Sequence, residues 1–286
     1  MQIKKSYDIN ELRDYSSLFS RSEVNCWLKL DFTSINLKIA RYQTGAKKHQ
    51  NYLDYLKHIY KILERYYPNE YIYKNEFLNK WLLKEIGTTK SKVFNEFRIG
   101  KAVADLVMFN GNSKVFEIKS LLDKESRLSN QLIEYKKIFN EVYIIVPDVK
   151  LKKYLSFDNT IGIITYNNEL KQFLLIRSAK KNNEIDVNSL MNVFHTKEYI
   201  KLVQDYYGLI PSYTDFNKFE VCKNLILKIP VEYVNEFFIQ TMKKRKINNA
   251  FSFKSTNEFN QVCLSLNLND KQKEKLFINL KSAITA

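Results

Sequence analysis

Three residues whose side chains could do chemistry together lie close in the sequence. Asp105 interrupts the apolar run AVADLVMF (102–109), and Glu117 and Lys119 interrupt the run KVFEIKS (114–120). Both runs have the length and the composition of β-strands, and the NGN between them is typical of a tight turn. A carboxylate in such a run needs a compensating partner, because burial of an unpaired charge is costly.

The length of this turn decides whether the three side chains meet. With a three-residue turn, 110–112, paired positions sum to 222 and Asp105 lies opposite Glu117. Opposed residues share one face of a sheet, and the period of two places Lys119 on that face too. A two-residue turn would point the two acids to opposite faces. The hypothesis of a common site therefore predicts the register of two strands.

A hard divalent cation, Mg²⁺ or Mn²⁺, would compensate two facing carboxylates. Mg²⁺ prefers oxygen ligands, needs one or two protein carboxylates and keeps bound waters. Such a metal can activate a water and neutralise charge that develops on a phosphodiester. Lys119 could position or deprotonate that water or stabilise the same charge, and the sequence leaves these roles open. The alternative is a structural surface pair of Glu117 and Lys119 near the strand end.

The elements around these residues predict an α/β (α+β) core in which helices pack on a mixed sheet. The first seventy residues have helical periodicity, and Asn75 is a plausible N-cap for the next helix. In chain order we expect a helix over 75–86, strands over 92–99, 102–109 and 114–120, a helix over 127–139, and strands over 141–147 and 161–166. We expect three consecutive parts: a helical N-terminal region (1–70), the core (71–179) and a helical C-terminal domain (180–286).

The charge of the chain favours a polyanionic partner. The formal net charge is +15, and the excess is +5 in each of the segments 1–75, 76–179 and 180–286. Clustered cations bind nucleic acid by releasing counterions, but an even excess also suits an ordinary solvated surface. One helix, VEYVNEFFIQTMKKRK, ends in four cations that could contact phosphates or simply oppose the helix dipole: Lys243, Lys244, Arg245 and Lys246.

At this point the residues resemble a known superfamily. The pattern ADLVMFNG…FEIKS…D…RL…Q…Y…F…V.IIVP, with AD and EIK on adjacent strands followed by a helix, is similar to the PD-(D/E)XK nucleases. It resembles most a group of largely uncharacterised bacterial proteins with an AD…EIKS pattern. The resemblance covers residues 70–166 well and implies a restriction-endonuclease-like core with N- and C-terminal helical regions.

The resemblance assigns roles to individual residues. Asp105 matches the metal-binding aspartate, Glu117 the second acidic ligand and Lys119 the signature lysine, and the backbone carbonyl of Ile118 would be a further metal ligand. Gln131 matches a helix glutamine that reaches the active site or the DNA backbone in many such nucleases. One departure is Ala104, which stands where the superfamily's name has a proline.

Glu96 is a further catalytic candidate, and Glu76, Asp123 and Arg127 are possible accessory residues. Superfamily members often place an additional glutamate near the metal, and Glu96 on the first strand and Glu76 on the preceding helix are both candidates. We prefer Glu96, because an acid between two phenylalanines is otherwise hard to explain, although an exposed position would also explain it. Asp123 and Arg127 could orient Lys119 or touch a phosphate, and Asp123 could equally cap the following helix.

These observations predict a magnesium-dependent deoxyribonuclease, an endonuclease or an exonuclease, acting in defence or mobile-element processing. The alternatives are a catalytically silent nucleic-acid-binding protein and a protein-interaction module built on the same fold. DNA is the expected partner, RNA is not excluded, and a protein partner or a homo-oligomer is possible. The sequence has no run typical of a signal peptide or a membrane span, so we expect a cytoplasmic bacterial protein with no membrane partner.

Overall fold

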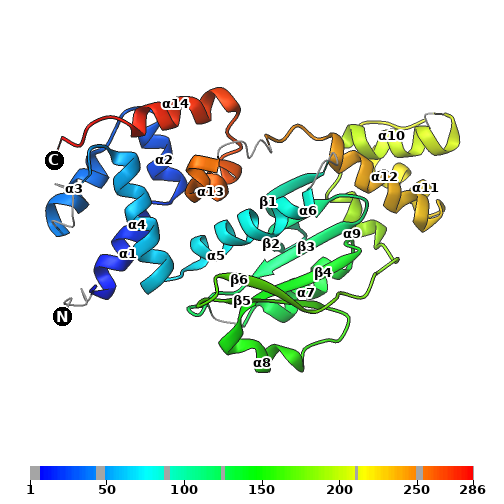
Figure 1. Cartoon of the computed structure of the whole chain (residues 1–286). Helices are drawn as coiled ribbons and strands as arrows, with labels where there is room; N and C mark the ends of the chain where they lie inside the picture. The colour runs from blue at the N-terminus through cyan, green and yellow to red at the C-terminus, as the bar shows by residue number, and fades with distance from the viewer. Residues whose placement is uncertain are drawn as a thin grey trace. The chain divides into compact units, whose positions relative to one another are not determined.

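The chain folds into two units, each with its own core (Figure 1). The computed structural model describes residues 7–42, 49–86, 91–123, 126–209, 212–248 and 254–285. The helical unit contains residues 1–84, 120–122 and 248–286, and the sheet unit contains residues 85–119 and 123–247.

This division corrects the expected succession of three parts, 1–70, 71–179 and 180–286. Residues 190–242 share one hydrophobic core with the sheet, whereas residues 259–280 share the core of the N-terminal helices. Sequence periodicity shows which residues of a helix are buried but not which element they are buried against. For this reason the prediction from the sequence placed both segments in one C-terminal domain.

The helical unit is built from both ends of the chain. Its helices are α1 (Ile9–Ser17), α2 (Arg21–Trp27), α3 (Thr33–Tyr42), α4 (Tyr52–Tyr66), α5 (Glu70–Phe77), a π-helix (Leu78–Leu82), the start of α6 (Leu83–Ile86), a 3₁₀-helix (Lys254–Phe259), α13 (Asn260–Ser265) and α14 (Asp270–Leu280). The side-chain amide of Asn279 donates to the backbone carbonyl of Trp27 at 2.8 Å, which ties α14 to α2. The helical reading of the first seventy residues is confirmed over the described part.

The expected helix over 75–86 is the second half of a longer helical segment. Its N-cap is Asn69, whose side-chain oxygen accepts from the backbone N–H of Ile72 at 3.0 Å. The prediction of Asn75 as N-cap was wrong. Asn75 is fully buried, and its amide donates to the hydroxyl of Tyr60 at 2.8 Å and to the carbonyl of Asn257 at 3.0 Å. Both asparagines precede a helical stripe, but only Asn69 comes directly after Pro68, at the break that follows α4.

The sheet unit contains one six-stranded mixed sheet, so the chain has a mixed α/β fold. The strands are β1 (Lys92–Ile99), β2 (Ala102–Phe109), β3 (Ser113–Ile118), β4 (Glu141–Pro147), β5 (Gly162–Asn167) and β6 (Gln172–Arg177), in spatial order 1-2-3-4-5-6. Strands β3, β4 and β5 pair in parallel, and the other neighbours are antiparallel. The expected strands are all present. Strand β6 was missed, because three consecutive exposed apolar residues, Leu174, Leu175 and Ile176, hide any alternation.

The predicted register of β2 and β3 is confirmed. Leu106 pairs with Phe116, and Phe109 pairs with Ser113, so paired positions sum to 222. The intervening turn has three residues and is closed by the backbone N–H of Asn110, which donates to the carbonyl of Asn112 at 3.2 Å. Asp105 and Glu117 are the next positions in this register.

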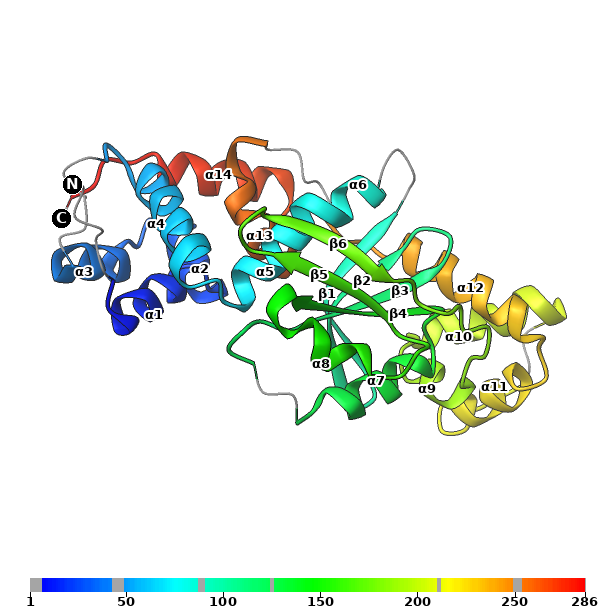
Figure 2. The same cartoon turned by 60° about the horizontal axis from the view of Figure 1, so that its bottom comes forward.

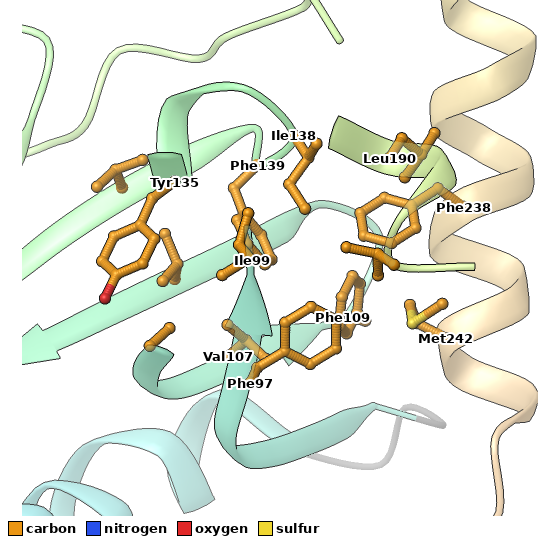
Figure 3. Close-up of a cluster of buried hydrophobic side chains, with 14 of the residues drawn as sticks. Phe97, Ile99, Val107, Phe109, Tyr135, Ile138, Phe139, Leu190, Phe238 and Met242 are labelled. Carbon is orange, nitrogen blue, oxygen red and sulfur yellow. The ribbon is translucent and has the colours of Figure 1, made fainter. Parts of the chain in front are cut away.

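Helices cover the sheet and extend its core (Figure 2). They are α7 (Leu128–Lys136), a 3₁₀-turn (Asp148–Lys150), α8 (Leu151–Leu155), α9 (Val187–Met191), α10 (Thr196–Tyr207), α11 (Lys218–Ile226) and α12 (Val231–Lys244). Helix α7 contacts β2 and β4, and α12 contacts β2. Figure 3 shows Phe238 and Met242 of α12 beside Phe109 of β2, where the rings of Phe109 and Phe238 meet edge-on at 5.3 Å. Among the described residues no helix is both long and apolar enough to cross a lipid bilayer.

Candidate active site

The two acids of the predicted site lie on adjacent strands, β2 and β3. Asp105 is half-buried and Glu117 is only 2% exposed. The Asp105 carboxylate reaches across to β3, where its Oδ2 accepts from the backbone N–H of Ile118 at 2.7 Å. This bond holds Asp105 beside the residue that follows Glu117. The structure thus brings together the two carboxylates that the sequence predicted to face each other.

Glu117 belongs to a closed ring of four side chains, two from the end of β3 and the residues after it and two from α7. Lys119 Nζ donates to Glu117 Oε1 at 2.7 Å and to Gln131 Oε1 at 3.3 Å. The Tyr135 hydroxyl lies 2.7 Å from Glu117 Oε2, and Gln131 Nε2 donates to that hydroxyl at 3.3 Å. With Lys119 only 8% exposed, the ammonium compensates a buried carboxylate. The alternative of an exposed Glu117/Lys119 surface pair is therefore wrong.

Helix α7 supplies one side of the ring because of its spacing. Gln131 and Tyr135 are four residues apart, so both side chains lie on the same stripe of the helix. Leu128 and Leu132, buried in the core, fix this face of α7 against the sheet. In Figure 3 the ring of Tyr135 lies at one end of the hydrophobic cluster with its hydroxyl directed away from it.

Tyr135 is the site residue that sequence reasoning missed, since its helical spacing marks it as a core residue. Its ring is fully buried, and its hydroxyl also lies 3.0 Å from the backbone carbonyl of Val103. Burial, followed by the charge of Glu117, raises the pKa of Tyr135 far above its usual value. The phenol therefore stays protonated and acts as a donor. Two signals could have found it: the i, i+4 spacing to Gln131 and its place in the Q…Y part of the superfamily-like pattern.

The donor set at this site fits a hard divalent cation. Asp105 and Glu117 offer carboxylate oxygens from neighbouring strands, which are the ligands that Mg²⁺ prefers. Among the described residues there is no group of three or more His, Cys, Asp or Glu side chains suited to a metal. The backbone carbonyl of Ile118 and water could complete the ligand set of the two carboxylates. In the structure, Lys119 and Tyr135 occupy both oxygens of Glu117.

Glu96 lies in the same row of the sheet as the two acids. Asn95 pairs with Leu106 and Phe97 with Ala104, so Glu96 stands across from Asp105 in the register of β1 and β2. Glu96 has a positive φ of 52°, which interrupts the pairing at that position. This conformation is costly for a non-glycine residue and often marks a functional position. Its side chain is exposed.

Glu76, the rival candidate, belongs to the helical unit. Its Oε1 accepts from the Tyr60 hydroxyl at 2.6 Å, and its Oε2 pairs with Lys80 Nζ at 2.6 Å. Both carboxylate oxygens are thus engaged within the helical unit itself. These contacts explain why a buried glutamate is tolerated there without a metal.

The two accessory candidates that follow β3, Asp123 and Arg127, differ in exposure and in their position relative to α7. Arg127 is the N-cap of α7 and is exposed, while Asp123 is half-buried. The alternative role of Asp123 as a cap of α7 is wrong, because the helix begins after Arg127 and no side chain caps it.

One of the four cations at the end of α12 is engaged by a carboxylate of the same unit. The Arg245 guanidinium donates to both carboxylate oxygens of Glu198, at 2.9 and 2.6 Å, and to the carbonyl of Val193 at 2.8 Å. Burial raises the pKa of Glu198, but the hydrogen bonds from Arg245 and from the backbone N–H of His195, together with the charges of these two residues, leave that pKa below its usual value. Arg245 therefore ties α12 to α10, which corrects its expected role as a nucleic-acid contact. Lys244 and Lys246 are exposed and Lys243 is half-buried.

The fold and the site define a mixed α/β protein whose six-stranded sheet carries two neighbouring carboxylates and a buried lysine beside a covering helix. The chain belongs to the family described as Bacteriophage P4 protein cII, whose model matches residues 64–266.

One relative and one solved structure are similar to the chain. Protein cII of Enterobacteria phage P4 is 25% identical over 198 residues, which is 68% of this chain and 73% of that protein. A solved structure described as SPO1766 protein of unknown function from Silicibacter pomeroyi is 12% identical, covering 47% of this chain and 88% of that one with a TM-score of 0.33. A TM-score this low does not establish a shared fold.

Proposed function

We propose that this chain is a metal-dependent nuclease that hydrolyses phosphodiester bonds of DNA. The observation that carries the proposal is the buried Glu117 next to Asp105 on the neighbouring strand, with Lys119 bonded to Glu117. Two acids that converge with a lysine under a covering helix are costly to the fold unless they serve a purpose.

The order of elements supports a restriction-endonuclease-like core. Three antiparallel strands are followed by α7 and then by β4, which returns parallel to β3. The acids lie on the second and third of these strands and Gln131 on the helix, in the order of the PD-(D/E)XK pattern. We interpret the sheet unit as a member of that superfamily on this basis.

Each residue of the site has a role in the proposed reaction. Asp105, Glu117 and the carbonyl of Ile118 would hold Mg²⁺ or Mn²⁺, which supplies an activated water and neutralises charge on the phosphodiester. Lys119 would orient that water or stabilise the developing charge. Gln131 and Tyr135 position the ammonium of Lys119 and the carboxylate of Glu117.

The test is cleavage of supercoiled, linear and single-stranded DNA by purified protein with Mg²⁺, Mn²⁺ or EDTA. We expect metal-dependent cleavage that disappears in Glu117→Gln and Lys119→Ala. The matched control is Glu169→Gln, which alters an exposed acid of the sheet unit and should cleave like wild type. Cleavage that persists in EDTA, or in folded Glu117→Gln, would contradict the proposal.

A catalytically silent DNA-binding protein is the second candidate. The observation that favours it is that Lys119 and Tyr135 already engage both oxygens of Glu117. In that case the ammonium of Lys119 permanently takes the place of a metal ion beside Glu117. Isothermal titration with Mn²⁺ separates the candidates: heat that is lost in Asp105→Asn supports the nuclease, and no binding supports the silent protein.

The biological setting follows the relative's source. Protein cII comes from Enterobacteria phage P4, so we place the proposed cleavage in the processing of mobile-element DNA inside a bacterial cell. Cleavage assays on RNA of the same sequence define whether DNA is the preferred substrate.

A further inference from the structure

A groove beside the ring of site residues runs between the first turns of α7 and the start of β2. Its volume is about 560 Å³, within the range of specific ligand sites. We call it the α7 groove. Its walls are formed by Lys101, Ala102, Val103, Arg127, Asn130, Gln131, Ile133 and Glu134.

The groove is continuous with the candidate active site through two residues. Gln131 lines the groove and also accepts a hydrogen bond from Lys119. Val103 lines it too, and its backbone carbonyl lies 3.0 Å from the Tyr135 hydroxyl. A molecule seated in the groove therefore ends next to the side chains proposed to act on a phosphodiester.

The charges of the groove favour an anion. Lys101 and Arg127 are exposed at its walls, and no ion pair engages either of them within the described part of the chain. Glu134 is the only acid among the described residues that line the groove, and it is compensated by Lys137 at 2.7 Å. Within the described residues, Lys101 and Arg127 therefore face the space with no uncompensated acid opposite them. Ile133, 57% exposed, offers an apolar surface for a sugar or a base.

The position of Lys101 is built into the fold. The preceding Gly100 has a positive φ of 53°, and a Cβ there would meet Glu134 Oε2 at 2.5 Å. Glycine adopts this φ without strain, and a larger residue would also force the end of the Glu134 side chain to shift. The turn therefore holds Lys101 beside the helix that carries Arg127.

From these observations we infer that the α7 groove binds the sugar-phosphate backbone of a DNA strand next to the bond to be cut, with Lys101 and Arg127 contacting its phosphates. This inference deepens the proposed function and names the part of the substrate that the site holds. Phosphate contacts release counterions, so each one makes binding more dependent on salt.

The test measures binding rather than cleavage. Fluorescence anisotropy with a labelled DNA single strand and its duplex, in EDTA, gives the affinity as salt is varied. For Lys101→Ala/Arg127→Ala we expect affinity to fall on the order of tenfold or more at about 0.1 M salt, and the slope of log affinity against log salt to become shallower by about two. Lys101→Arg/Arg127→Lys keeps both charges and should restore the slope.

The matched control is Lys152→Ala/Lys228→Ala. It also removes two exposed cations of the sheet unit, but neither residue lines the groove. Equal losses in both double variants would overturn the inference, since only net charge would then matter. Wild-type protein that binds labelled RNA but not DNA would overturn it as well. Groove-dependent binding without cleavage would reject the proposed nuclease while leaving the groove assignment intact.

Discussion

Each of the two units contains a buried glutamate that is bonded to one lysine and one tyrosine. In the sheet unit, Glu117 is bonded to Lys119 and Tyr135. In the helical unit, Glu76 is bonded to Lys80 and the hydroxyl of Tyr60. Burial is similar, 2% and 6% exposed. A tyrosine hydroxyl and a lysine ammonium are therefore sufficient to retain a buried glutamate, whatever its role.

What differs is the setting of each glutamate. Beside Glu117 the next strand carries a second carboxylate, Asp105, held to β3 by its bond to the N–H of Ile118. Beside Glu76 lies the amide of Asn75, which donates to the Tyr60 hydroxyl and closes a neutral network. A buried glutamate with a lysine and a tyrosine as partners can have a purely structural role. The second acid, Asp105, is what makes the Glu117 site a candidate metal site.

The largest expected difference is in catalysis. Glu117→Gln should lower the cleavage rate on the order of 10³-fold, which corresponds to about 4 kcal/mol of lost metal and transition-state stabilisation. Glu76→Gln should lower it far less, because Glu76 is engaged within the helical unit. Initial rates at saturating Mg²⁺, with folding checked by circular dichroism, measure both.

An equal loss of cleavage in a folded Glu76→Gln protein would contradict the expected difference between the two glutamates. It would assign Glu76 to the site, as the resemblance to PD-(D/E)XK nucleases first suggested. The change from glutamate to glutamine suits both sites, because glutamine has nearly the same shape and its side-chain oxygen can still accept a hydrogen bond from the lysine.

A smaller difference is expected in stability. Tyr135→Phe and Tyr60→Phe each remove one donor from a buried carboxylate, which should lower the free energy of unfolding by about 1–3 kcal/mol. Added Mg²⁺ should recover part of the loss for Tyr135→Phe, because a cation can replace the missing donor at Glu117. It should recover none for Tyr60→Phe. Urea unfolding with Mg²⁺ or EDTA measures this, and equal recovery in both variants would remove the distinction between the sites.

The smallest expected effect is on the pH dependence of unfolding. Burial, followed by the charge of Glu76, raises the pKa of Tyr60 well above its usual value of 10.0. The folded protein then keeps a proton that the unfolded chain loses above about pH 10, so stability contributed by Tyr60 is complete below that pH and falls as pH rises. The slope is up to about 1.4 kcal/mol per pH unit. Tyr60→Phe should flatten it in urea unfolding, and an unchanged slope would show that the hydroxyl is already ionised or solvated.

Much of the fold followed from local patterns. The strands at 92–99, 102–109 and 141–147 were predicted with the bounds that they have, because turns at Gly100 and at 110–112 separate short runs rich in β-branched and aromatic residues. The edge strand β6 was not predicted, because its four consecutive apolar residues, 173–176, show no period of two.

The candidate site was predicted to the extent that it lies along two neighbouring strands. Asp105, Glu117 and Lys119 are linked by one short turn, and counting its residues determines the register. Tyr135 was missed because its ring packs in the hydrophobic core, as its helical spacing indicates. Only the fold shows that its hydroxyl is directed to Glu117.

The sequence by itself determined most of the elements, the register of β2 and β3 and the convergence of Asp105, Glu117 and Lys119, because these depend on contacts between residues near in the chain. Only the tertiary structure decided that the last helices share a core with the first ones, that α12 belongs with the sheet, and that Arg245 pairs with Glu198. The physical reason is that hydrophobic burial has no direction. An apolar helix face can be covered by any complementary surface, so its partner is chosen only when the whole chain packs.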